Sequence, residues 1–225
     1  MRYPNIMPAV FIDRPNRFCA RVLLAGETEH VHVKNTGRCR ELLLPGAEVY
    51  LTEPETPGRK TRFDLVAVRK ADGRTVNIDS QAPNRAAGEW LGTQELTRIV
   101  PEYRYGESRI DFYMEREEKR YLMEVKGCTL EIGGVGYFPD APTQRGVKHL
   151  KELAKARGEG FHAAIAFVIQ MDGVREVRPN LSTHPGFGAA LEEARSAGVR
   201  VLFLPCHVEP DSLLVTDAVW EEPLR

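Results

Sequence analysis

The stretches that decide the fold of the second half are S-R-I-D-F-Y-M at Ser108–Met114 and Y-L-M-E-V-K at Tyr121–Lys126. Both are rich in aromatic and aliphatic residues, and a short charged segment separates them. They predict the two strands of an antiparallel hairpin, Glu107–Glu115 and Lys119–Lys126, with a turn at Glu117–Glu118.

The register of this hairpin brings two carboxylates together. With Arg116 opposite Lys119, Asp111 lies opposite Glu124, and cross-strand Cβ atoms are about 4.5 to 5.5 Å apart. Lys126 projects from the same face as Glu124, because alternate residues of a strand share a face. Opposed carboxylates repel and usually have a cation beside them. Carboxylate oxygens suit Mg²⁺ or Mn²⁺, and the Lys126 ammonium can activate water, so the pattern predicts a metal-dependent nuclease site.

An alternative keeps Asp111 and Glu124 as solvated polar positions on a half-exposed strand pair. The D...E-x-K pattern is short, and by itself it supports the two interpretations equally. Apolar neighbours favour the functional one, because unpaired charges are costly in a buried hairpin: Phe112, Tyr113, Leu122 and Met123.

Composition narrows the class of protein. The 225 residues carry a net charge of -1, with 13 Lys and Arg against 10 Asp and Glu in residues 1–83 and 18 against 22 in the remainder. Nucleic-acid contact would therefore depend on local patches. The four cysteines are scattered, so neither a disulfide framework nor a zinc site is expected. No apolar run approaches the roughly 20 residues of a membrane span, and we expect a cytoplasmic protein without membrane contact.

The first half favours short strands and no long helix. Five or six short strands in about 80 residues are typical of a small barrel, because closure removes exposed sheet edges. The expected strands are Ala9–Ile12, Phe18–Leu24, His30–Lys34, Glu48–Thr52, Arg62–Arg69 and Thr75–Asp79.

After the turn-rich segment Ser80–Asn84 the pattern changes to alternating helices and strands, which indicates two domains, 1–83 and 84–225. Besides the hairpin we expect strands at Gly134–Phe138, His162–Met171 and Val199–Leu204, and helices at Asn84–Leu96, Thr143–Arg157 and Gly188–Ala197. The segment after His207 predicts no clear element.

Two further groups could bind nucleic acid. In the helix Thr143–Arg157, Arg145, Lys148 and His149 share a face, where cations near a helix N-terminus could hold phosphate. The alternative is a solvated charged face. In the first domain, a second group of residues surrounds one turn and the start of one strand. It forms either a nucleic-acid-binding surface or an ordinary turn flanked by solubilising charge. Its members are His32, Lys34, Asn35, Thr36, Gly37, Arg38 and Arg40 at the turn, and Arg17 and Phe18 at the strand start.

Four other polar residues remain open. Asp140 is either a turn or capping residue or a further carboxylate near the metal, and the sequence supports the two alternatives equally. Glu89 and Glu95 lie on the expected helix Asn84–Leu96, and either could be an additional acidic residue of the site. Their spacing does not select one of them, and a position on the exposed surface would also explain either residue. Gln170 ends an apolar strand and needs a buried partner or a ligand.

Longer motifs resemble the sugar fermentation stimulation protein family. They are G-E-S-R-I-D-F, M-E-V-K, F-P-D-A-P-T-Q-R-G-V-K-H-L-K-E-L, N-T-G-R, L-L-x-P-G and F-V-I-Q, which together cover nearly the whole chain. The resemblance implies an N-terminal OB-like barrel and a C-terminal PD-(D/E)XK nuclease-like α/β domain with a mixed central sheet. It also implies DNA binding and a role in regulating sugar catabolism. Lys34 and Arg38 depart from the family's usual Pro and Ser around N-T-G, so the partner of this turn is open.

Our leading hypothesis is a DNA-binding protein with a phosphodiesterase site. Asp111 and Glu124 bind Mg²⁺ or Mn²⁺, Lys126 activates water, and Arg145 and Lys148 position phosphate. The rival is a non-catalytic DNA-binding regulator that retains the nuclease fold. An enzyme acting on sugars has no supporting motif. The oligomeric state, a homodimer included, stays open.

Overall fold

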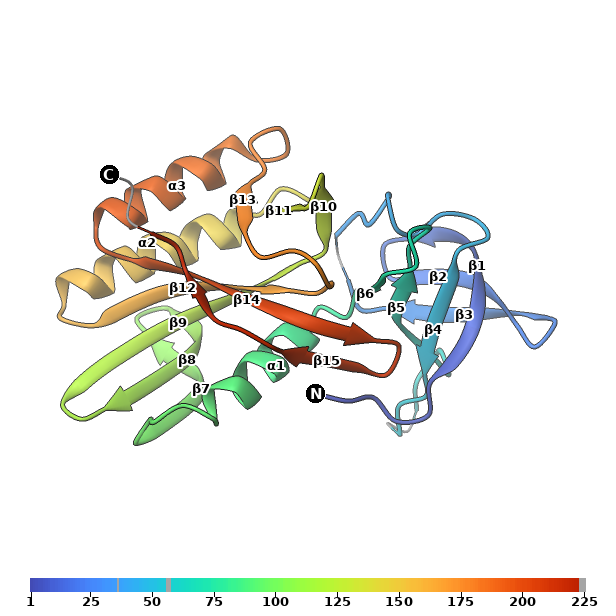
Figure 1. Cartoon of the computed structure of the whole chain (residues 1–225), viewed down its shortest axis with the longest axis horizontal. Helices are drawn as coiled ribbons and strands as arrows, with labels where there is room; N and C mark the ends of the chain where they lie inside the picture. Colours follow the sequence, from blue (N-terminus) through green and yellow to red (C-terminus); the bar gives the residue numbers. More distant parts are fainter. Residues whose placement is uncertain (36, 56–57, 223–225) are drawn as a thin grey trace.

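The computed structural model describes residues 1–35, 37–55 and 58–222. The first part is a closed barrel, in which β3 pairs with β5 in parallel and joins the ends of the sheet order β3-β2-β1-β4-β5. It lies on the right in Figure 1. A short sixth strand extends the sheet from β5. The strands are β1 (Met7–Asn16), β2 (Cys19–Leu24), β3 (Glu27–Val33), β4 (Glu48–Thr52), β5 (Asp64–Arg69) and β6 (Thr75–Asn77).

Alternating burial explains why these strands close. Ala20 and Val22 of β2 and Val31 and Val33 of β3 are fully buried, while the residues between them are more exposed. That period of two puts one face of each strand into the barrel. The β2–β3 turn has two consecutive positive φ angles, which match the twist of a two-residue hairpin, at Ala25–Gly26.

The second part is a mixed sheet with helices on both faces (Figure 1). Its order is β15-β14-β12-β9-β8-β7, with β16 on β14; β9, β12 and β14 run parallel and the others antiparallel. Helices α2 (Gln144–Gly158) and α3 (Pro185–Ser196) cover one face and α1 (Ala82–Leu91) the other. The strands are β7 (Arg98–Tyr105), β8 (Ser108–Arg116), β9 (Lys119–Cys128), β12 (His162–Ile169), β14 (Arg200–Glu209), β15 (Ser212–Val215) and β16 (Val219–Trp220).

The central strand β12 is buried on both faces. Ile165, Phe167 and Ile169 belong to the core under α2 and α3, whereas Ala166 and Val168 belong to the core under α1. This explains the nearly continuous apolar run of the sequence. A separate three-stranded sheet, in the order β10-β11-β13, accompanies the mixed sheet. Its strands are β10 (Leu130–Ile132), β11 (Val135–Phe138) and β13 (Val177–Pro179).

The predicted fold class, an OB-like barrel followed by an α/β domain with a mixed sheet, is confirmed. Several details differ. The first helix ends at Leu91, not Leu96, and the sequence prediction lacks the strands β7, β10 and β13. Strand β7 is half exposed and contains Pro101, which is typical of an edge strand with a weak apolar signal. The segment after His207, for which no element was predicted, completes β14 and forms β15 and β16.

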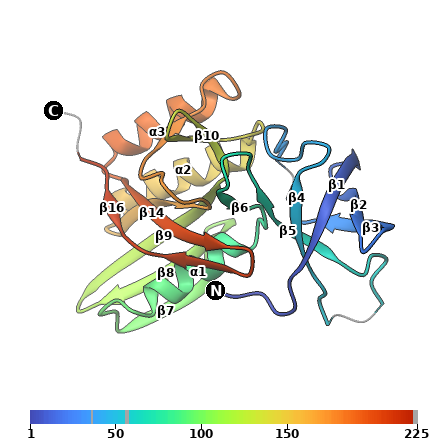
Figure 2. The ribbon, with the colours of Figure 1, turned by 45° about the vertical axis from the view of Figure 1, so that its right-hand side comes forward.

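The two domains meet through buried polar side chains. Gln170, at the end of β12, donates to Asn77 Oδ1 at 2.8 Å, and Asn77 donates to the Tyr3 hydroxyl at 2.9 Å. The Tyr3 hydroxyl donates to Asp79 at 3.2 Å. Tyr3 belongs to the N-terminal segment, which runs from the barrel toward the second domain (Figure 2). Gln170 thus has the buried partners that its sequence context required.

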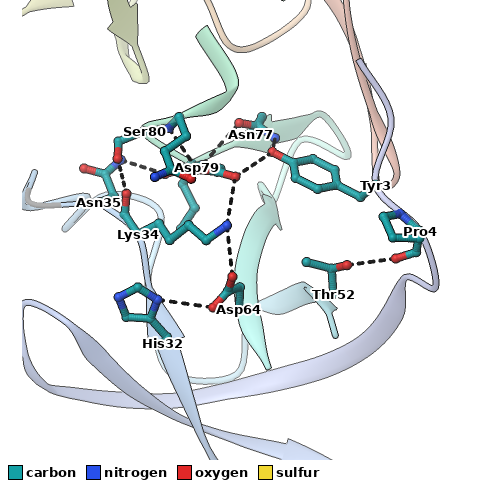
Figure 3. A network of polar contacts seen from close by, with 12 residues as sticks. Tyr3, Pro4, His32, Lys34, Asn35, Thr52, Asp64, Asn77, Asp79 and Ser80 are labelled. Carbon is teal, nitrogen blue, oxygen red and sulfur yellow. Dashed lines mark hydrogen bonds and ion pairs between the residues drawn. The ribbon is translucent and has the colours of Figure 1, made fainter. Parts of the chain in front are cut away.

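A buried ion cluster extends this network into the barrel (Figure 3). Asp64 is fully buried and Asp79 is 2% exposed. The Lys34 ammonium lies 2.9 Å from Asp64 Oδ2, as an ion pair without hydrogen-bond geometry, and 3.7 Å from Asp79. His32 and Arg59 contact the other Asp64 oxygen. Each buried carboxylate therefore has a cation beside it.

Among the described residues, no helix has both the length and the apolar character needed to span a membrane.

Candidate active site

Both domains line one polar cleft of about 460 Å³. The barrel contributes the loop after β3, the start of α1 supplies polar side chains, and β8, β9, β11 and the loop before α2 form the rest. The lining includes Asn35, Gly37, Ser80, Asn84, Asp111, Val125, Lys126, Thr129, Tyr137, Asp140, Arg145 and Gln170.

The hairpin that carries the acidic residues has the predicted register. Arg116 pairs with Lys119 and Phe112 with Met123, so the next pair along would be Asp111 and Glu124. The ladder stops before that pair, and Asp111 Oδ2 instead accepts a hydrogen bond from the Val125 backbone N–H at 2.7 Å.

Asp111 is held at the floor of the cleft by two donors. Besides the Val125 N–H, Asn84 Nδ2 donates to Oδ1 at 2.7 Å. Burial and, next, the charge of Glu124 raise the pKa of Asp111, while the Val125 N–H, Lys126 and Asn84 partly oppose the shift. A buried carboxyl with a raised pKa gains most when a cation arrives to stabilise its charged form.

Glu124 is 2% exposed, and its side-chain partners among the described residues all contact one oxygen, Oε1. Lys126 Nζ lies 2.5 Å from Oε1, and His149 Nδ1 contacts the same oxygen. Burial would raise the pKa of Glu124, but the His149 hydrogen bond and the Lys126 charge outweigh burial and lower it. Oε2 is buried without a hydrogen-bond partner among the described residues.

These groups fit a hard divalent cation. A buried carboxylate oxygen without a donor is costly unless something satisfies it, and an ion ligated by oxygen would do so. Within residues 1–35, 37–55 and 58–222, no three His, Cys, Asp or Glu side chains form a complete metal site. Mg²⁺ is commonly held by one or two carboxylates and several waters, so a pair of carboxylates such as Asp111 and Glu124 is compatible with it.

The three residues of helix α2 that the sequence predicts on one phosphate-binding face have different surroundings in the structure. Its N-cap is Thr143, whose hydroxyl accepts from the Gly146 N–H at 3.0 Å. Arg145, in the first turn of α2, lines the cleft. His149 is 5% exposed and bridges Arg145 Nε, at 3.3 Å, to Glu124. Lys148 is half exposed, lies 3.8 Å from Glu152 and lines a different surface depression, so its side chain is not part of the cleft wall.

Asp140 joins the two domains at the cleft. Its Oδ2 accepts a hydrogen bond from the Cys39 backbone N–H at 2.9 Å. A Cβ at Gly37 would come within 2.7 Å of the same oxygen, so glycine permits this close approach. Of the two interpretations left open, the contact favours a structural role in the turn. Glu89 pairs with the amino group of Met1 and Glu95 with Arg116, both outside the cleft.

The barrel residues with predicted DNA contacts are placed differently from one another. Lys34 is engaged by Asp64 and Asp79, so its charge is neutralised inside the protein. Asn35 lines the cleft, where its amide donates to the Ile78 carbonyl at 2.9 Å. Arg17 lies over the exposed Phe18 ring at 4.8 Å. Arg38 is exposed, and Thr36 lies outside the described residues.

Two residues that shape the cleft were missed by sequence reasoning. Asn84 binds Asp111, whereas the sequence places it at the domain boundary and at a helix start without a role in the site. Arg14 donates to the carbonyls of Arg17, Gly37 and Arg38 at 2.7 to 3.0 Å and holds the barrel loop in place. Nothing in the local sequence distinguishes Arg14 from a surface arginine, whereas the Pro-Asn pair at a helix start could have signalled Asn84.

The chain matches known families along most of its length. A family model described as the SfsA N-terminal OB domain matches residues 12–78, and one described as the sugar fermentation stimulation protein RE domain matches residues 81–212. A sugar fermentation stimulation protein homolog of Desulfitobacterium hafniense (strain DSM 10664 / DCB-2) is 49% identical over 222 residues, which is 97% of each chain. One from Clostridium beijerinckii is 48% identical over 223 residues, 97% of this chain and 98% of the relative.

A solved structure has the same overall arrangement. The structure titled "The structure of Pyrococcus Furiosus SfsA in complex with Ca2+" superimposes with a TM-score of 0.83 at 30% sequence identity. The match covers 100% of this chain and 96% of that one.

Proposed function

The chain belongs to the sugar fermentation stimulation protein family, and we propose that it is a nucleic-acid-binding, divalent-metal-dependent phosphodiesterase. One observation carries the proposal. Among the described residues the buried Glu124 Oε2 has no hydrogen-bond donor, and the partner of Glu124, Lys126, lines the cleft together with Asp111 and Arg145. Two carboxylates and two cations at one polar cleft suit a metal ion together with a phosphate.

The solved structure of Pyrococcus furiosus SfsA is described as a complex with Ca²⁺, which supports the proposal of a metal-binding site in this fold. Ca²⁺ and Mg²⁺ are both hard cations that prefer oxygen ligands, so Asp111 and Glu124 suit either, and Mg²⁺ or Mn²⁺ is the cofactor that we propose. When bound, such an ion acts as a Lewis acid on the phosphodiester and lowers the pKa of water.

The remaining roles belong to the side chains. Lys126, 15% exposed and paired with Glu124, can orient a water or stabilise charge that develops on the phosphate oxygens. Arg145 offers a guanidinium that can bind phosphate through two parallel hydrogen bonds. His149 holds Glu124 and Arg145 in their positions and acts as a positioning residue.

The OB barrel supports nucleic acid as the ligand. Barrels of this type bind nucleic acid through charged grooves and aromatic platforms, and here Asn35 and Gly37 of the barrel form part of the same cleft. We propose DNA as the partner.

The test compares the native protein with Asp111→Asn and Glu124→Gln on labelled DNA and RNA in Mg²⁺, Mn²⁺ or EDTA. Both substitutions preserve shape and remove a charge. We expect metal-dependent cleavage by the native protein, reduced by at least about 100-fold in each variant, since each removes a metal ligand. Glu95→Gln, an exposed carboxylate outside the cleft, is the matched control. Salt-sensitive binding without cleavage would instead support the non-catalytic regulator.

A further inference from the structure

We infer that the cleft accepts a single strand of nucleic acid and excludes an intact duplex. The inference rests on the proposed function of the cleft and adds the substrate class. It follows from how the two domains bound the cleft, from its size and from the groups that line it.

The walls of the cleft touch each other at one end. Asp140, in the loop before α2, accepts the Cys39 N–H of the barrel loop at 2.9 Å. Gly37 packs so closely there that even a Cβ would meet Asp140. Arg14 fixes the barrel loop by bonding to its carbonyls, so this wall is braced from behind. A ligand that reaches Asp111 and Lys126 must therefore enter between two joined domains.

The size of the cleft suits a nucleotide or two. Its volume of about 460 Å³ falls in the range of roughly 300 to 1,000 Å³ that holds small ligands. A duplex brings its second strand and grooves, the wider being about 12 Å across and 8.5 Å deep. A cleft of about 460 Å³ cannot also enclose this second strand and its grooves when a phosphate is beside Lys126.

The lining also offers what an unpaired nucleotide needs. Lys126 and Arg145 supply cations for its phosphate, and Tyr137, half buried on β11, supplies an aromatic surface for a base. Asn35 uses one amide hydrogen on the Ile78 carbonyl, which leaves the second for a base edge. Base edges and faces are available in this way only when the strand is unpaired.

Two cleavage substrates separate the inference from the proposed function: circular single-stranded DNA and covalently closed duplex DNA of the same sequence, each in Mg²⁺. A single-stranded RNA arm tells DNA from RNA. We expect the single-stranded circle to be cleaved at least about 10-fold faster than the closed duplex. Equal rates would overturn the inference and leave the phosphodiesterase intact.

Binding tests the inference even if no substrate is cleaved. Fluorescence anisotropy in Ca²⁺ would compare a labelled single-stranded oligonucleotide with its blunt duplex, for the native protein, Tyr137→Ala and Tyr105→Ala. Tyr105 is a half-buried tyrosine on the edge strand β7, outside the cleft. We expect tighter single-strand binding, weakened about 10-fold by Tyr137→Ala alone. Tighter duplex binding, or equal losses in both variants, would refute the inference.

Discussion

In the part of the chain that the structure describes, one lysine lies beside two buried carboxylates in the barrel and another does so in the second domain, and the two clusters differ in how their carboxylates are used. In the barrel, Lys34 lies between Asp64 and Asp79 (Figure 3). In the second domain, Lys126 pairs with Glu124 near Asp111. The lysines are similarly shielded, at 21% and 15% side-chain exposure, so burial alone does not distinguish the clusters.

The difference lies in how the carboxylate oxygens are used. Both oxygens of Asp64 have a cation beside them, and Asp79 accepts from Tyr3 and the Gln81 N–H. Glu124, in contrast, contacts both Lys126 and His149 through Oε1. The first cluster is internally balanced within the barrel domain. The second keeps an acceptor in reserve beside a cleft, which is the property expected of a ligand site.

The same substitution in both clusters gives the largest expected contrast. Lys126→Met should reduce metal-dependent DNA cleavage by about 10² to 10⁴-fold, because it removes the group that orients water or stabilises phosphate charge. Single-turnover cleavage with the metal in excess measures this effect. A Lys126→Met protein that cleaves at the native rate would remove Lys126 from the site.

Lys34→Met should instead act on stability. The change leaves Asp64 and Asp79 buried with one cation fewer, and breaking such a pair costs about 3 kcal/mol of unfolding free energy. Urea denaturation measures it, with the exposed Lys148→Met as control. If Lys34→Met unfolds like the native protein but binds DNA much more weakly, the barrel cluster is a binding surface and the contrast fails.

A metal titration sharpens the distinction further. At a free Mn²⁺ concentration 100 times the Kd, a single site would stabilise the folded state by about 2.7 kcal/mol. Thermal unfolding should show this stabilisation in the native protein and in Lys148→Met, and its loss in Glu124→Gln. Equal stabilisation of Glu124→Gln would place the metal elsewhere.

The smallest expected effect concerns an ionic contact that crosses between the two domains. Glu131 accepts from Lys70 at 2.6 Å and from Arg74 at 2.9 Å; Lys70, then the Gly134 N–H, lower its pKa to about 2. Because the folded-state pKa is lowered, this stabilisation is complete above the unfolded value near 4.5 and is lost as the pH falls toward 2. Glu131→Gln should cost about 1 to 3 kcal/mol at pH 7 and less at pH 3.

A pH series of urea denaturation curves for the native protein and Glu131→Gln measures that difference. A constant difference between pH 7 and pH 3 would mean that the charge of Glu131 contributes nothing to the contact.

Local patterns predicted the hairpin well. The spacing of Asp111, Glu124 and Lys126 around a charged turn determines the register, and the observed pairing of Arg116 with Lys119 agrees with it. Strand periodicity likewise predicted the barrel, and the apolar run of β12 predicted a strand covered on both faces. These features depend on neighbours in sequence.

Long-range partners could not be predicted. His149 shares a helix face with Arg145, but only the packing of α2 on the sheet turns its ring toward Glu124 rather than toward a phosphate. Lys34 carries the same charge in a solvated turn as in a buried cluster, and its partners Asp64 and Asp79 lie 30 and 45 residues away. The family resemblance supplied the fold class, yet it did not distinguish these roles.

The order in which the elements can form follows from the strand pairing. The barrel strands pair mostly with near neighbours in the chain, so that domain can assemble early. The central sheet must first bring β9, β12 and β14 into parallel register across long connections, and the Tyr3 N–H donates to the Asp211 carbonyl at 2.7 Å. The segment before the barrel therefore takes its final position only once Asp211 is in place.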